Sequence, residues 1–90
     1  MRYIRVDWKH DFAGDPVTIF SELDGQLWEQ RKIEVFRDGK LGYADKDEEF
    51  GGSMLGIEPW PNLETLGLEP EFEIQNISKE EFEGRWLQRR

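Results

Sequence analysis

The chain has 90 residues, enough for one hydrophobic core and one domain spanning residues 1–90. Twelve Lys and Arg against twenty Asp and Glu give a formal charge of -8, the wrong sign for a protein that neutralises the phosphates of DNA or RNA. No apolar stretch is long enough to span a bilayer, and without cysteine the chain has neither disulfides nor thiolate metal sites. Because the start also lacks the apolar run of a secretory signal, we expect a cytoplasmic domain.

The first forty-five residues predict an antiparallel β-meander. Residues 3–9 alternate polar and apolar side chains, which places Ile4, Val6 and Trp8 on one face of a half-buried strand. Asp-Gly pairs that favour tight turns mark two corners. The further strands are predicted over residues 17–23, 26–37 and 40–45, with the corners at residues 24–25 and 38–39.

Matching of side chains across the second corner selects its turn. A three-residue loop with Gly39 in the left-handed bulge position pairs Val35 with Leu41 and Ile33 with Tyr43. A two-residue loop gives poorer matches across the same two strands. We therefore predict the bulged turn.

The same loop type at the first corner pairs Phe20 with Trp28. It also places Glu29 and Arg31 on a face that otherwise carries apolar residues. One interpretation is structural: the two form an ion pair near the sheet edge, or a bulge turns both side chains outward. The other is functional, with the two charges forming the polar floor of a pocket.

The second half predicts a loop and then a helix. Asn62 is placed to cap a short helical turn through Leu66, and residues 72–77 predict an edge strand at best. Ser78 and Glu81 have the spacing of a capping box, so a helix of roughly eleven residues follows, docked through Phe82 and Trp86. The predicted fold is α+β: a four- or five-stranded antiparallel β-meander packed against one C-terminal helix.

Signals for catalysis or metal binding are weak. His10 precedes Asp11, but neighbours in a strand point to opposite faces, and Ser78 is better explained as a cap. The acidic run at residues 45–49 resembles the start of a calcium loop, yet Phe50 stands where that loop needs glycine. We expect no catalytic residue, no metal and no cofactor, and hence not an enzyme.

Negative charge is concentrated in the second half. Residues 45–83 carry twelve acids and two bases, whereas residues 1–43 carry eight and seven. Solubility alone explains much acidic surface, but clustered charge also steers a protein toward a basic partner. Trp60 stands between two prolines, either as a rigid anchor with an acidic rim or folded back over Phe20, Trp28 and Phe36. The candidate protein-binding residues are Asp45, Asp47, Glu48, Glu49, Glu58, Trp60 and Glu64.

Two other functional interpretations remain open. A homo-oligomeric subunit is one. The other is a small-ligand-binding domain or enzyme with a pocket on the sheet face, whose expected lining is Trp8, His10, Trp28, Glu29, Arg31 and Tyr43.

Several segments together resemble a family of small bacterial domains of unknown function. The likeness covers nearly the whole chain and is most specific over residues 28–44. It implies a compact bacterial domain and transfers no reaction, cofactor or catalytic residue. From size and charge we expect a non-enzymatic protein-binding module, in its concrete form an immunity-type inhibitor of a basic toxin. The segments that carry the resemblance are residues 8–12, 21–24, 28–39, 42–44 and 77–82.

Overall fold

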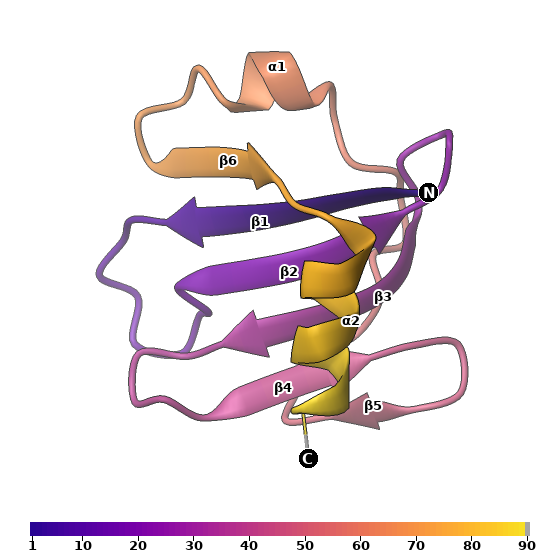
Figure 1. Ribbon diagram of the computed structural model, residues 1–90. Helices are drawn as coiled ribbons and strands as arrows, with labels where there is room; N and C mark the ends of the chain where they lie inside the picture. Colours follow the sequence, from indigo (N-terminus) through magenta and orange to yellow (C-terminus); the bar gives the residue numbers. More distant parts are fainter. Residues whose placement is uncertain (90) are drawn as a thin grey trace.

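The computed structural model describes residues 1–89. Six antiparallel strands form one sheet in the order β5-β4-β3-β2-β1-β6, and the helix α2 crosses one of its faces (Figure 1). The predicted α+β class is confirmed, although the sheet has one strand more than the larger number expected. The elements are β1 (Arg2–Trp8), β2 (Thr18–Leu23), β3 (Glu29–Val35), β4 (Leu41–Ala44), β5 (Glu49–Phe50), α1 (Leu63–Leu66), β6 (Phe72–Asn76) and α2 (Lys79–Leu87).

The face of the sheet that α2 covers holds an aromatic core. Ser78 caps the helix as predicted, its Oγ accepting a hydrogen bond of 3.0 Å from the backbone N–H of Glu81. Phe82 and Trp86 are buried against the sheet, and burying such a side chain stabilises the fold by about 1.5–3 kcal/mol. A nine-residue helix is marginal alone, so this docking holds it in place. The core comprises Tyr3, Phe20, Ile33, Tyr43, Phe82 and Trp86.

The opposite face, called here the second face, holds a separate aliphatic core. Ile4 and Val6 are fully buried in it, as the alternation of residues 3–9 predicts. Leu63 of α1 joins this core, and Trp60 packs against it. The prediction that the loop around Trp60 covers this face is confirmed. Its expected contact with Phe20 is wrong, because Phe20 faces α2.

The second corner has the predicted geometry. Gly39 has a φ of 87°, and Val35 pairs with Leu41 and Ile33 with Tyr43. The predicted edge strand is also present: β6 lies at the outer side of β1, where Ile4 pairs with Asn76. Local turn chemistry and alternation therefore determine this part of the sheet.

The register at the first corner differs from the prediction, because Phe20 pairs with Ile33 and not with Trp28. The turn forms two residues later than expected, and the left-handed position is taken by Leu27, with a φ of 68°. Asp24 holds this turn by accepting hydrogen bonds at its Oδ1 from the backbone N–H groups of residues 26 and 28. A register shift between residues 22 and 23 then adds a bulge.

Candidate functional site

The bulge places Glu29 and Arg31 on opposite faces of the sheet. Glu29 pairs with Leu23 and Arg31 with Glu22, so one residue of β3 has no counterpart on β2. The extra residue reverses the side on which the following side chains lie. The expectation that both charges share one face is wrong, and they form neither an ion pair with each other nor one pocket floor.

Arg31 lies beneath α2 and clamps the helix to the sheet. Its Nε and Nη2 donate hydrogen bonds of 2.8 Å each to the two carboxylate oxygens of Glu22, and Nη1 donates to Glu83 at 3.3 Å. The guanidinium also lies 5.0 Å from the centre of the Phe82 ring, a distance that favours a cation–π contact. Hydrogen bonds to Glu22 and Glu83 use four of its five N–H groups, which gives it a structural role.

These contacts shift the pKa values of the groups around Arg31. Hydrogen bonds from Arg31 hold the pKa of Glu22 and the pKa of Glu83 below the ordinary value of 4.5, although burial acts in the opposite direction. Burial, and then its hydrogen bond to Glu22, raise the pKa of Tyr3 above 10.0. The charged form of both carboxyls is therefore favoured in the folded protein.

Glu29 is buried on the second face, with its side chain only 2% exposed. Its Oε2 accepts a hydrogen bond from Ser21 Oγ at 3.1 Å, and its Oε1 accepts one from the backbone N–H of Gly56 at 2.7 Å. Lys32 Nζ lies 3.1 Å from the same Oε1. This carboxylate fastens the segment 53–57, called here the strap, to the sheet, and Ser53 adds a hydrogen bond to Glu34.

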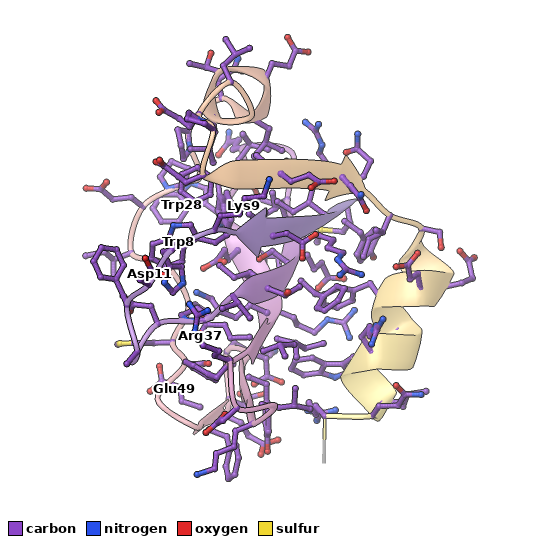
Figure 2. The ribbon with its side chains drawn as sticks, turned by 90° about the vertical axis from the view of Figure 1, so that its left-hand side faces the viewer. Trp8, Lys9, Asp11, Trp28, Arg37 and Glu49 are labelled. Carbon is purple, nitrogen blue, oxygen red and sulfur yellow. The ribbon has the colours of Figure 1, made fainter. Side chains whose placement is uncertain are left out.

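Trp8 is the last residue of β1, and His10 follows it in the loop 9–16, which it shapes. His10 Nδ1 accepts a hydrogen bond of 3.0 Å from the backbone N–H of Phe12, and Nε2 lies 2.7 Å from the carbonyl oxygen of Pro16. The two bonds require the neutral ring with its proton on Nε2. The Trp8 and His10 rings are 4.1 Å apart, in the region that Figure 2 shows away from α2.

The six residues of the expected ligand pocket are therefore dispersed. Arg31 faces α2, as does Tyr43 in the aromatic core. Trp28 and Glu29 stand at the start of β3, whereas Trp8 stands at the end of β1. Because the strands are antiparallel and in register, these ends are separated by about 20 Å, the length of six residues of strand. The single pocket is a wrong prediction, caused by the misplaced register.

The acidic candidates also divide into two groups. Asp45 to Glu49 form the β4–β5 turn and the start of β5 at one edge of the sheet. Glu58 and Glu64 form a second group that runs from beside Gly56, which Glu29 of β3 binds, to α1 near the β6 edge (Figure 1). Six strands at a spacing of about 4.8 Å separate those edges by roughly 24 Å. The candidate protein-binding residues therefore do not form one continuous acidic surface. Trp60 is half-buried against the aliphatic core of the second face, so it is not an exposed anchor.

Within the first acidic group, Asp45 has a local structural role. Its Oδ1 accepts hydrogen bonds from the backbone N–H groups of Asp47, at 2.8 Å, and of Glu48, at 2.7 Å. The bond from residue 47 is the main cause that lowers the pKa of Asp45 below 3.8. These bonds hold the turn so that Asp47, Glu48 and Glu49 are exposed to solvent.

A feature that sequence reasoning missed is an open hollow of about 1220 Å³ beside this turn. It lies between the loop 11–14, the corner 36–40 and the residues at the end of β5, with Phe36, Leu41 and Phe50 among its lining. Asp11 and Arg37, which Figure 2 labels, belong to its rim. The available signal was the exposed aromatic Phe50 directly after an acidic run, but the hollow needs three segments far apart in sequence.

Comparison with known proteins places the chain in a family. Residues 2–90 match the family described as a domain of unknown function, DUF6881. The chain belongs to this family. The resemblance predicted from the sequence is thereby confirmed. No curated protein matches the chain, and neither does any solved structure.

Residues 1–89 of this DUF6881 domain include no helix that is both long and apolar enough to cross a membrane. Nor do three or more His, Asp or Glu side chains come together, over the same residues, in a group that could hold a metal ion. The accessible chemistry of the DUF6881 domain is instead the acidic turn with its neighbouring hollow. Phe50 links them: it is 57% exposed, yet its ring stacks on Tyr43 at 5.2 Å.

Proposed function

We propose that this DUF6881 domain is a non-enzymatic protein-binding module that recognises a basic protein surface. The recognition element is the acidic hairpin, defined here as residues 45–50. One observation carries the proposal: three exposed carboxylates stand beside Phe50, an exposed aromatic ring that Tyr43 holds in place. A rigid aromatic residue with a charged rim is typical of binding hot spots.

The buried charged groups support binding over catalysis. Arg31 and Glu29 have their hydrogen-bonding positions occupied by partners within the domain, and each fixes one covering element, α2 or the strap. Both nitrogens of His10 are likewise engaged with the backbone. A general base needs a lone pair that faces substrate, and these groups direct theirs inward.

The concrete form of the proposal is an immunity-type inhibitor that covers the basic active groove of a toxin. The formal charge of -8 supports it, because opposite charge accelerates encounter and rejects partners of the wrong sign. The acidic hairpin lies at the β5 edge of the sheet beside the C-terminal end of α2, where Arg89 lies 3.9 Å from Glu48, so a groove that encloses the hairpin also reaches this end of the helix (Figure 1).

A pair of variants with equal net charge tests the proposal. In one, Asp47, Glu48 and Glu49 are changed to Lys; in the control, the exposed residues Glu64, Glu69 and Glu71 are changed to Lys. The genes that adjoin this domain's gene are searched for a nuclease toxin, and association with its purified product is measured at low and high salt.

We expect the hairpin variant to associate at least about tenfold more slowly at low salt, with a smaller effect in the control. Equal slowing in both variants would show that net charge alone acts. If the unmodified domain neither binds nor inhibits the nuclease, the immunity form is wrong.

A further inference from the structure

We propose that the open hollow beside the acidic hairpin receives an apolar side chain of the same basic partner. The inference rests on the proposed function and deepens it, because it assigns the partner a recognition motif: one aromatic or aliphatic residue flanked by Lys or Arg. The acidic hairpin then supplies charge complementarity, and the hollow supplies the apolar anchor site.

The size and lining of the hollow suit part of a protein better than a small molecule. Its volume of about 1220 Å³ exceeds the roughly 300–1,000 Å³ of most small-molecule sites, and it is open to solvent. Phe36, Leu41 and Phe50 contribute apolar surface to its lining. A second, more polar hollow of about 320 Å³ shares Phe36, Gly14 and Gly51 with it and extends toward the strap.

The walls of the hollow are fixed before any partner arrives. The corner closes through the hydrogen bond from Phe36 N to the carbonyl of Lys40, at 2.9 Å, and Arg37 donates to the carbonyl of His10 in the facing loop. The hairpin passes very close to β4: a Cβ on Gly51, whose φ is 69°, would lie 2.9 Å from the Cα of Gly42. A preformed site avoids the entropy cost of ordering its walls on binding.

The adjacent hairpin, and not the lining of the hollow, favours cationic residues beside the occupant: residues 45–49 carry four acids and one base, whereas the lining carries two acids and three bases. The bases of the lining already have partners in the domain: Lys40 Nζ lies 3.9 Å from Asp38 Oδ2, and Arg89 Nη2 lies 3.9 Å from Glu48 Oε1 of the hairpin. The acids of the two hollows and of the adjacent hairpin outnumber the bases of the same surface by seven to four, leaving out Lys32 and Glu34, which are bonded on the second face. The acids are Asp11, Asp15, Asp38, Asp45, Asp47, Glu48 and Glu49, and the bases are Arg37, Lys40, Lys46 and Arg89.

Two peptides of equal charge test the inference on the full chain. One is Lys-Lys-Phe-Lys-Lys and the other is Lys-Lys-Ser-Lys-Lys, and each is titrated into the ¹⁵N-labelled domain while amide NMR shifts are recorded. We expect the Phe peptide to bind roughly tenfold more tightly, because it buries an aromatic side chain. Its shifts should centre on Leu41, Phe50 and Gly51.

Two glycine substitutions provide a blocked hollow and a matched control. No atom lies within 4 Å of a Cβ built on Gly14, which lines the hollow, or on Gly25, which lies at the first corner. Gly14→Phe should remove the preference for the Phe peptide, and Gly25→Phe should leave it unchanged. Thermal unfolding of both variants confirms that each is folded.

The outcomes separate this inference from the proposed function. If both peptides bind the acidic hairpin equally and in a salt-dependent way, the anchor site is wrong and recognition of a basic surface stands. If neither peptide shifts the hairpin amides, both are overturned. Concentration-dependent shifts at the hollow without peptide would mean that a second copy of the chain occupies it, which also overturns the inference.

Discussion

Arg31 of β3 donates two hydrogen bonds to Glu83 of α2, which lies 52 residues away in sequence, and the same guanidinium also donates to Glu22 of β2. One guanidinium thus connects two strands and the helix that covers them. Glu22 is 8% exposed, so its charge depends on this connection. The aromatic core beneath α2 is organised around a cation.

Replacing Arg31 should therefore destabilise the domain strongly. Arg31→Gln leaves Glu22 buried without its main partner, and we expect the free energy of unfolding to fall by about 2–4 kcal/mol. Arg85→Gln is the control, because Arg85 is exposed and lies over Phe20; its cost should stay below about 1 kcal/mol. Urea denaturation measures both, and similar losses in the two variants would contradict the clamp.

The contacts of Arg31 with Glu22 and Glu83 also make the stability of the domain depend on pH in the acidic range. Arg31 lowers the folded pKa of Glu22 and of Glu83 below 4.5, so the stabilisation is fully present above that value and is lost as pH falls through the folded pKa values. We expect the unfolding free energy to fall below about pH 4.5, and to fall less steeply in Glu22→Gln. Denaturation between pH 2 and 7 measures the slope; an unchanged slope in the variant would assign the acid sensitivity to other carboxyls.

At position 27, a glycine variant should be more stable than an alanine variant, which reverses the usual order of stability. The Leu27 φ of 68° is strained for any residue with a Cβ, and its carbonyl accepts the N–H of Trp60 at 2.9 Å, which holds it there. Leu27→Ala and Leu27→Gly both lose the side chain, but only glycine relieves the strain. We expect the glycine variant to be more stable than the alanine variant by about 1 kcal/mol. Chemical denaturation compares them, and a more stable alanine variant would refute the strain.

Glu29 should control the strap. Glu29→Ala removes the acceptor for the Gly56 N–H and leaves Lys32 half-buried without its carboxylate. We expect a loss of about 2–4 kcal/mol and much faster hydrogen exchange at the Gly56 amide. Glu58→Ala, at an exposed position on the same side, is the control. Protection of Gly56 that survives in Glu29→Ala would show that other contacts fasten the strap.

Local signals predicted much of the fold, and tertiary contacts decided the rest. Gly39 and Ser78 were predictable because each residue type suits the backbone geometry it adopts. Leu27 was not, because leucine rarely adopts a positive φ and its contact with Trp60 lies outside the turn. The bulge in the β2–β3 pair was missed for the same reason. It separates Glu29 and Arg31, which alternation alone places on one face.

The candidate site was predicted only in part. The exposed acids of residues 47–49 are visible in the sequence, but β5 has two residues and carries no strand pattern. The hollow could not be predicted, because Phe36 and Phe50 contribute to it only after the loop 11–14 folds against them.

The position of β1 between β2 and β6 has a consequence during synthesis. The β1–β6 pairing joins Ile4 to Asn76, so β1 keeps one row of backbone N–H and C=O groups unpaired until residue 76 has left the ribosome. The nascent domain therefore exposes a free strand edge until that point, and chaperones that bind extended chains would meet it there before β6 closes the sheet.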